Sequence, residues 1–287
     1  MSKQTILITG ASRGIGFLTA KTLVNHGHTV YAGMREINGR NKEGADFFRS
    51  LNNSVSGSIY PIEMDVTDNN QCNEVIRYIE NNNHIDVLIN NAGIMPVGLT
   101  EAFTEEQVQQ CFSVNLYGAI NCTKAVLPAM RKRKNGKLIH LSSSAGRLAI
   151  PYFGVYCASK WALEAYTESL HYELAQFNIH TCIVEPSGHA TDLVSSSPSP
   201  KDAIKLEYGN LAQGGEKLLN MFKDMFSQGE ETTNAQNVAD QLLKLVEQTE
   251  SLPLRIAIGQ DMGVKNINDG TAPIQTQLIE QLLPVYE

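Results

Sequence analysis

Short apolar runs rich in β-branched residues alternate with longer segments of helical periodicity, and this alternation constrains the fold most. The apolar runs lie at residues 5–9, 29–32, 59–64, 85–89, 137–141 and 180–184. The helical segments between them lie at residues 14–26, 41–52, 70–82, 104–133 and 153–177. Further along the chain we expect a helix near 237–248 and a last strand near 254–258. The sequence therefore predicts an α/β fold with about seven parallel strands in one doubly wound sheet, flanked by helices.

Two polar pairs predict where helices begin, and one polar segment predicts a loop. Thr104 with Gln107 and Asp68 with Gln71 each have the spacing of a capping box. The segment 195–200 is rich in serine and proline, but apolar helical sequence resumes after it. We therefore expect a mobile loop at 195–200 within a single domain that spans residues 1–287.

Composition and charge exclude several classes of function. The formal net charge is −7, which gives no general attraction to nucleic acid, and the basic run 131–134 is expected to close a helix, where cations meet the negative end of its dipole. The apolar runs are far shorter than the roughly 18 residues of a membrane span, and no secretory signal is visible. Five cysteines without a CxxC pair favour reduced thiols and a cytoplasmic location, and seven histidines without ligand spacing predict no metal.

A glycine-rich segment joins the first strand to the first helix. It contains Gly10, Gly14 and Gly16 in the run that begins at Thr9. Glycines in such a turn let the backbone approach a pyrophosphate, and the free N–H groups of the helix that follows attract anions. A glycine turn also occurs for packing alone, but the strand before it and the helix after it favour a dinucleotide site in a Rossmann-type fold.

The end of the second strand indicates which dinucleotide binds. An acidic residue there would bind the ribose 2′-hydroxyl, whereas arginine suits a 2′-phosphate. The strand ends with Met34 and Arg35, and Arg13 in the glycine turn reaches the same region. We therefore expect NADP(H) rather than NAD(H). Glu36 is the contrary observation, because it would serve as the ribose acid if the strand ended later.

Tyr156 and Lys160 are four residues apart within a predicted helix, so they lie on one face. A phenol with a pKa near 10 is a poor acid or base at neutral pH, but a neighbouring ammonium group is expected to lower that pKa. The pair would then act as a general acid and base. The alternative is a solvated helix face, which often carries these residue types.

Several motifs in order along residues 3–192 resemble the short-chain dehydrogenase/reductase family, in its non-extended branch. The motifs are Thr9-Gly10 with Gly14 and Gly16, Asp65-Val66, Asn90-Asn-Ala-Gly93, Asn115, Ser143, and Tyr156 with Lys160. The resemblance implies hydride transfer between the nicotinamide and a carbonyl carbon while Tyr156 gives a proton to the developing alkoxide. It further implies that Ser143 bonds the substrate oxygen, Lys160 holds the nicotinamide ribose, and Asn115 keeps a water in the proton path.

The resemblance also assigns dinucleotide contacts by position, with Asp65 at the adenine and Thr191 at the carboxamide. The full expected set is Gly10, Ser12, Arg13, Gly14, Ile15, Gly16, Arg35, Asp65, Val66, Asn91, Ala92, Gly93, Tyr156, Lys160, Pro186, Gly188 and Thr191. Family members commonly have Pro-Gly after the sixth strand, whereas this chain has Pro186-Ser-Gly188, so the glycine is displaced by one position.

By this resemblance, residues 3–192 form the cofactor and catalytic core, 189–230 a substrate loop or lid, and 235–287 the last helix, last strand and tail. The apolar side chains Met221, Phe222, Met225 and Phe226 either cover an apolar ligand or belong to the core. We expect an NADP(H)-dependent oxidoreductase acting on a lipophilic ketone, aldehyde or secondary alcohol, such as a steroid or a retinoid. The alternatives are a 3-oxoacyl-thioester reductase and a dinucleotide-sensing protein without turnover.

Two further expectations concern assembly. Trp161 follows the catalytic lysine and is expected to pack on a helix or a second subunit, and the resemblance implies a homodimer or homotetramer. The tail residues Ile279, Leu282 and Leu283 are expected to pack on the body or on a partner subunit.

Cys157 adjoins the tyrosine but points about 100° away on a helix, so we expect it to be packed.

Overall fold

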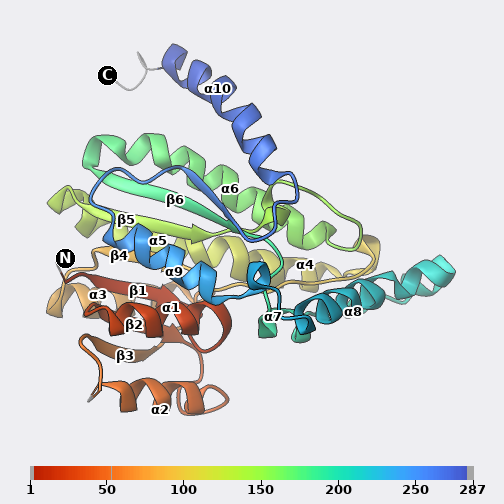
Figure 1. Cartoon of the computed structure of the whole chain (residues 1–287), viewed down its shortest axis with the longest axis horizontal. Coiled ribbons are helices and arrows are strands. Elements are labelled where there is room, and N and C mark those ends of the chain that lie inside the picture. The colour runs from red at the N-terminus through yellow and green to blue at the C-terminus, as the bar shows by residue number, and fades with distance from the viewer. Residues whose placement is uncertain (1–2, 53, 283–287) are drawn as a thin grey trace.

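A computed structural model describes residues 3–52 and 54–282, and the described residues form a seven-stranded parallel sheet between two layers of helices (Figure 1). The strands are β1 (Thr5–Thr9), β2 (Thr29–Met34), β3 (Ser58–Glu63), β4 (Val87–Asn90), β5 (Gly136–Leu141), β6 (Ile179–Pro186) and β7 (Arg255–Ile258). Every neighbouring pair is parallel, in the order β3-β2-β1-β4-β5-β6-β7. The predicted α/β class, doubly wound topology and strand number are confirmed.

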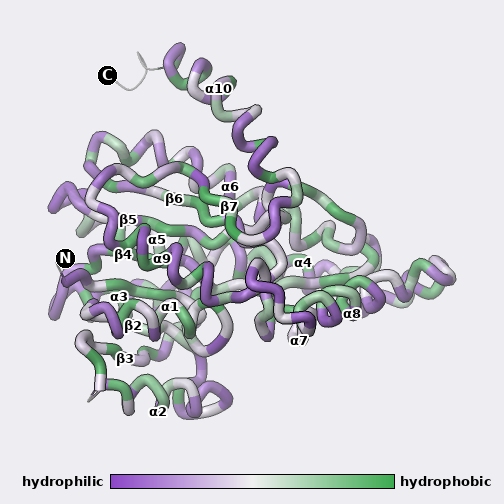
Figure 2. The backbone as a smooth tube through the Cα atoms, in the orientation of Figure 1, coloured by the Kyte–Doolittle hydropathy of each residue, from purple (hydrophilic) through white to green (hydrophobic). Residues whose placement is uncertain are grey.

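The helices cover both faces of the sheet. They are α1 (Gly14–Asn25), α2 (Lys42–Leu51), α3 (Asn69–Asn82), α4 (Glu105–Phe112), α5 (Gly118–Arg133), α6 (Gly154–Leu174), α7 (Asp192–Ser195), α8 (Gly214–Ser227), α9 (Gln236–Glu247) and α10 (Val264–Leu282). Alternate residues of one strand enter different cores, since Ile6 and Ile8 pack with α1, α2 and α9 whereas Leu7 packs with α3, α5 and α6. Figure 2 shows the strands as largely hydrophobic, as expected for a sheet buried on both faces.

The strand order reverses direction at β1, and this reversal positions the site. From β1 the chain winds outward to β2 and β3, and then crosses to β4 on the other side of β1. The connections that follow β1 and β4 therefore diverge at the carboxyl edge of the sheet and leave a crevice between them. The glycine turn follows β1, and the Asn90-Asn-Ala-Gly93 segment begins at the last residue of β4.

The predicted helix at 104–133 contains a local irregularity. α4 and α5 are joined by a π-helical turn over Ser113–Tyr117, which carries the buried side chain of Asn115. Thr104 and Gln107 form the predicted capping box at the start of α4. At α3 the prediction was wrong in part, because Asp68 caps the helix while the Gln71 side chain accepts a hydrogen bond from the Asp65 backbone instead of the Asp68 backbone.

The C-terminal third contains the segment expected to form a lid and a projecting helix. α7 and α8 lie beside the carboxyl edge of the sheet, and α10 leaves the body at its upper side (Figure 1). The segment 195–200 is tied down by hydrogen bonds from Val97 N to Pro198 O at 3.0 Å and from Gln107 Nε2 to Ser199 O at 2.8 Å. Leu282 is exposed at the end of α10, and Leu283 lies outside the described residues.

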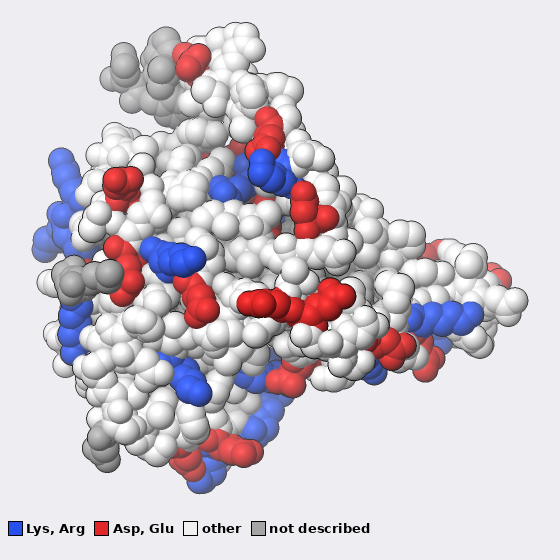
Figure 3. Space-filling view, in the orientation of Figure 1, with Lys and Arg blue, Asp and Glu red and all other residues white. Residues whose placement is uncertain are grey.

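Charged side chains of both signs lie on the surface of the described residues. Acidic and basic side chains are interspersed on the face shown in Figure 3. Arg133 ends α5, and its Nη1 lies 3.1 Å from Glu80 Oε2, so part of the basic run 131–134 is neutralised within the fold. No helix within residues 3–52 and 54–282 is long and apolar enough to cross a membrane.

Candidate active site

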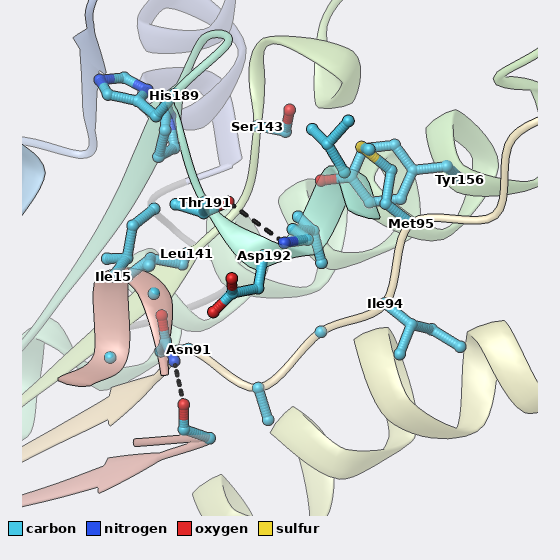
Figure 4. Close-up of a pocket in the computed structure, with 18 of the residues that line it drawn as sticks. Ile15, Asn91, Ile94, Met95, Leu141, Ser143, Tyr156, His189, Thr191 and Asp192 are labelled. Atoms are coloured by element: carbon cyan, nitrogen blue, oxygen red, sulfur yellow. Dashed lines mark hydrogen bonds between the residues drawn. The ribbon is translucent and has the colours of Figure 1, made fainter. Parts of the chain in front are cut away.

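A cavity of about 350 Å³ opens at the carboxyl edge of the sheet and extends from the glycine turn to the lid (Figure 4). All seventeen residues expected to contact a dinucleotide line this one cavity. Of the four expected catalytic residues, Ser143, Tyr156 and Lys160 line it too. In Figure 4, Ser143 and Tyr156 lie across the cavity from Ile15 and Asn91.

The glycines of the turn have distinct structural reasons. Gly10 and Gly14 have φ values of +68° and +57°, which side chains with a Cβ rarely adopt. A Cβ on Gly10 would lie 2.8 Å from Ala92 Cα, and a Cβ on Gly16 would lie 2.4 Å from Asn91 Nδ2. The turn is therefore fitted closely against the loop that follows β4.

That loop is held by the end of β1. Thr9 Oγ1 accepts hydrogen bonds from Asn91 N at 3.0 Å and Ala92 N at 3.1 Å, and Asn91 Nδ2 donates to Thr9 O and Gly10 O. These bonds fix the separation of the two diverging connections. The crevice is thus built by backbone and amide groups before any ligand enters.

The start of α1 suits an anion. Arg13 stands at the N-cap position without a side-chain capping bond, and the first turn holds no acidic residue. The first N–H groups of the helix therefore remain available, and the helix dipole adds positive potential at the glycine turn.

Three arginines line the cavity, namely Arg13, Arg35 and Arg40. Arg35 Nη1 is 3.7 Å from Asp65 Oδ2 and half exposed, and Arg13 Nη2 donates to Ser196 Oγ at 3.2 Å. Sequence reasoning missed Arg40, although a second arginine in the same β2–α2 connection was the available signal.

Glu36 does not face the cavity. β2 ends at Met34, as the sequence predicted, and Glu36 has a φ of +50°. Its backbone N–H donates to Glu63 Oε1 at 2.7 Å, and its carboxylate pairs with Arg40 Nε at 3.2 Å. The contrary interpretation of Glu36 as the ribose acid finds no support in this geometry.

Tyr156 and Lys160 are buried on one face of α6. Lys160 Nζ lies 5.9 Å from the centre of the Tyr156 ring and donates a hydrogen bond to Leu141 O at 2.7 Å. Burial lowers the pKa of Lys160 to about 8. Burial also raises the pKa of Tyr156, and a hydrogen bond with Ser143 opposes this only in part.

The expected lowering of the Tyr156 pKa by Lys160 is therefore wrong for this arrangement. Desolvation dominates because both side chains are about 5% exposed and the ammonium group bonds to a backbone carbonyl rather than to the phenol. The phenol keeps its proton at neutral pH. A group in this state can donate a proton to an alkoxide that develops beside it.

Asn115 is the one expected catalytic residue that does not line the cavity. It is buried, and its Oδ1 accepts from Ile94 N at 2.8 Å while its Nδ2 donates to Ile94 O and Ser159 Oγ, each at 2.9 Å. These bonds fix the loop after β4 against α6. The structure thus shows Asn115 positioning backbone, and the expected ordered water stays a prediction.

The loop after β6 borders the middle of the cavity. Pro186, Gly188 and Thr191 line it, and Thr191 caps α7 by accepting a hydrogen bond from Leu193 N at 3.4 Å. His189 is buried in the same loop, where its Nδ1 lies 2.9 Å from Ser187 O. The displaced glycine is compatible with a loop that still lines the cavity.

The lid end of the cavity is apolar. Its lining side chains come from five separate segments and are Met95, Leu148, Ile150, Phe153, Leu193, Val194, Phe222, Phe226 and Met262. Phe153 and Phe222 meet edge to face at 6.0 Å, and Phe222 stacks on Phe226 at 6.2 Å. Of the lid side chains considered, Phe222 and Phe226 face the cavity, whereas Met221 is exposed. Met262 and Leu148 were missed because nothing local in the sequence marks them.

Two neighbours of Tyr156 and Lys160 on α6 have different environments. Cys157 is packed as expected, with its Sγ 3.6 Å from Leu148 O. Trp161 is 48% exposed in the single chain, so it does not pack fully on a helix of its own subunit.

Comparison with known proteins identifies the family. The sequence model described as short chain dehydrogenase matches residues 4–202. A 3-ketodihydrosphingosine reductase of Bacteroides thetaiotaomicron is 39% identical over 192 residues, which is 67% of this chain and 66% of that protein's length. An uncharacterized oxidoreductase of Bacillus subtilis, YusZ, is 33% identical over 267 residues, or 92% of this chain and 91% of that one.

A solved structure agrees over the whole chain. A short-chain dehydrogenase from Streptomyces avermitilis has a TM-score of 0.75 and 28% identity, and the match covers 99% of this chain and 98% of that one. The protein therefore belongs to the short-chain dehydrogenase family of oxidoreductases.

Proposed function

We propose that this chain is an NADP(H)-dependent oxidoreductase that interconverts a lipophilic ketone or aldehyde and the corresponding alcohol. The observation that carries the proposal is that Tyr156, Lys160 and Ser143 line the same cavity as the glycine turn. A sensor without turnover has no physical need for these three groups beside its dinucleotide.

The residues present fit a dinucleotide. The open start of α1 and the left-handed glycines form a cradle for a pyrophosphate, and a Cβ on Gly93 would enter the space within 3.7 Å of Lys160 Nζ. Thr191 and Gly188 would border the nicotinamide, and Lys160 would hold its ribose. When bound, the nicotinamide supplies or accepts the hydride.

The chain's own groups would manage the proton. Tyr156 donates its phenolic proton to the oxygen of the carbonyl as negative charge develops there, and Ser143 donates a hydrogen bond to the same oxygen. Lys160, with its pKa lowered by burial, supplies positive charge beside the phenolate that remains. For alcohol oxidation the same groups act in the reverse direction.

The arginines at the adenosine end support NADP(H) over NAD(H). Guanidinium groups match a 2′-phosphate, and Arg13, Arg35 and Arg40 line the cavity, whereas Glu36 pairs with Arg40 and does not line it. The Asp65 carboxylate, which also lines the cavity, would favour NAD(H), and Arg35 pairs with it.

The apolar lid end supports a lipophilic substrate. The relative from Bacteroides is named for a reductase of a ketone, 3-ketodihydrosphingosine, and a ketone of lipophilic character would suit the Phe222 and Phe226 rings. A 3-oxoacyl-thioester reductase is the second candidate, because the same proton chemistry serves a 3-oxo group.

The test is a panel of lipophilic ketones, aldehydes, secondary alcohols and 3-oxoacyl thioesters followed at the nicotinamide absorbance with NADPH or NADP⁺, using Tyr156→Phe as control. We expect turnover of apolar ketones that disappears in the variant. Turnover confined to thioesters would favour the second candidate. Dinucleotide binding without any turnover would favour a sensor.

We also propose that two or four copies associate, with the exposed Trp161 and Tyr117 in the contact. These aromatic side chains are 48% and 55% exposed in the single chain. Light scattering of the intact chain should give a dimer or tetramer mass, and Trp161→Lys should lower it; a monomer mass for the unmodified chain contradicts the proposal.

A further inference from the structure

A buried cluster of charged side chains lies behind the cavity and is not used by the proposed reaction. Arg255 of β7 points its Nε at Glu164 Oε2 of α6, 3.0 Å away, and at Glu185 Oε1 of β6, 3.6 Å away. Glu164 is 3% exposed and Glu185 is 1% exposed. Two carboxylates and one guanidinium thus meet where three elements of the site join.

The cluster extends to the neighbouring elements. Arg255 Nη2 lies 2.5 Å from Glu168 Oε2, also on α6, and Asn268 Nδ2 of α10 donates to Glu185 Oε2 at 2.6 Å. Arg147 Nε donates to Asn268 Oδ1 at 2.9 Å from the turn after β5. The other titratable neighbours include Lys160 of α6, one turn before Glu164, Tyr172 of α6, near Glu168 and Arg255, and Cys182 of β6, near Glu185.

The cluster is connected directly to the groups proposed for catalysis. Tyr156, Lys160 and Glu164 follow at intervals of four residues, so they share one face of α6. Glu185 immediately precedes Pro186, where the loop that lines the cavity begins. Any change in the distance between Glu164 and Glu185 therefore changes how α6 is seated against that loop.

The three carboxylates of the cluster converge on one guanidinium group. Among the described residues, Arg255 is the cation within 4 Å of Glu164, Glu168 and Glu185, and Arg147 and Lys160 act on Glu164 from further away. Within the same residues neither Glu164 Oε1 nor Glu185 Oε1 has a hydrogen-bond partner. Burial raises the pKa of Glu164, and burial together with the Glu164 charge raises the pKa of Glu185 to about 7. A proton that neutralises Glu185 removes the repulsion between these two buried carboxylates.

We propose that Glu164, Glu185 and Arg255 form a proton-dependent clamp that positions α6 against the loop after β6, so that losing the proton weakens dinucleotide binding. These are positioning residues, because they act through α6 and the loop rather than by touching the reacting atoms. The effect on binding rests on the proposed function, whereas the effect on folding stability does not.

The decisive variant is Glu185→Gln, which keeps the shape and the oxygen that accepts from Asn268 but cannot be charged. The matched control is Glu80→Gln, which alters a carboxylate paired with Arg133 outside the cluster. Affinity for NADPH is measured by nicotinamide fluorescence from pH 6 to 8.5, and the melting temperature is measured over the same range without ligand. Comparing variants removes the titration of the 2′-phosphate itself.

Between pH 6 and 8.5 we expect the dissociation constant for NADPH to rise in the unmodified chain and in Glu80→Gln, with an inflection near pH 7. The rise should be about fivefold larger than in Glu185→Gln. The folded chain binds more protons than the unfolded chain between the unfolded and folded pKa values of Glu185, so stability falls as pH rises through that interval. The melting temperature of Glu185→Gln should accordingly fall less above pH 6. If Glu185→Gln shows the same inflection as the unmodified chain, both in NADPH affinity and in melting temperature, the clamp is overturned.

A second variant tests the clamp even if Glu185→Gln folds poorly. Asn268→Asp adds a negative charge beside Glu185 and should move the inflection upward by about one pH unit, because like charges disfavour ionisation. An unmoved inflection contradicts the proposal. If NADPH does not bind at any pH, the proposed function fails, and the melting profiles still decide whether the clamp exists.

Discussion

The two ends of the cavity are built by different means. At the dinucleotide end, main-chain groups form the wall of the cavity. Hydrogen bonds from Asn91 N to Thr9 Oγ1 and from Asn91 Nδ2 to Thr9 O hold the loop after β4 against the glycine turn. At the lid end, apolar side chains from segments far apart in the chain define it, as in the contact of Phe153 with Phe222. A wall made of closely packed backbone tolerates few substitutions. A wall made of apolar side chains can change shape when one side chain replaces another.

The difference teaches how one fold can keep its cofactor and vary its substrate. The dinucleotide end is formed where β1 and β4 terminate, so any sequence that forms the sheet must place those connections together. The lid end depends on α8, which packs on the body through a small separate core around Met95 and Tyr156, and on Met262 of the loop before α10, which lines the cavity. Four substitutions test this comparison.

The largest effect is expected where the two ends meet. Tyr156→Phe removes the proton donor and should lower kcat by roughly a thousandfold, within the range of positioned acid catalysts. The ring and its edge contact with Phe153 at 5.9 Å remain, so NADPH affinity should stay within twofold. Steady-state kinetics and fluorescence titration measure the two quantities. Retention of full turnover would remove Tyr156 from the mechanism.

The dinucleotide end should fail when its backbone is disturbed. Gly10→Ala introduces a Cβ that meets Ala92 Cα at 2.8 Å in a left-handed conformation, so NADPH affinity should fall by roughly ten- to a hundredfold. Gly270→Ala is the control, because a Cβ there meets nothing within 4 Å inside α10 and should raise stability slightly. Equal binding by Gly10→Ala and the control would show that the turn is less constrained than the structure indicates.

The arginines should affect one cofactor and not the other. Arg35→Ala removes a half-exposed guanidinium and should raise the KM for NADPH about tenfold while changing that for NADH by less than twofold. Arg49→Ala, which removes a surface partner of Asp46, is the control. A parallel change for both dinucleotides would mean that Arg35 does not meet a 2′-phosphate.

The smallest effect is expected at the lid end. Phe226→Ala removes one ring of a stacked pair and should raise the KM for an apolar ketone about fivefold, with NADPH affinity unchanged. Met221→Ala, on the exposed side of the same helix, should leave both values alone. If Met221→Ala has the larger effect, the lid closes through a different face of α8.

Much of the fold and site could be predicted because the signals are local. The strand β2 ends at Met34, α3 begins after Asp68, and Cys157 is packed, each as the sequence indicated. The expectations that were wrong concerned contacts that residue spacing alone does not decide. Gln71 bonds to Asp65 instead of completing a capping box, and the Lys160 ammonium donates to Leu141 O instead of lowering the Tyr156 pKa.

The lid showed the limit of periodicity most directly. Helical spacing placed Met221, Phe222, Met225 and Phe226 together on one predicted helix without deciding which of them face a ligand. In the structure Phe222 and Phe226 line the cavity, and Met221 is exposed. Met262 lines the cavity from a loop that carries no pattern of its own.

The sequence by itself determined the order of strands and helices, the glycine turn and the spacing of Tyr156 and Lys160, because hydrophobic period, backbone freedom and helical pitch act over a few residues. Only the tertiary structure decided that Asn115 holds the Ile94 backbone, that the lid end is apolar, and that Glu164 and Glu185 share one arginine. Desolvation and ionic contacts depend on which distant segments meet, and that is settled by packing rather than by any local pattern.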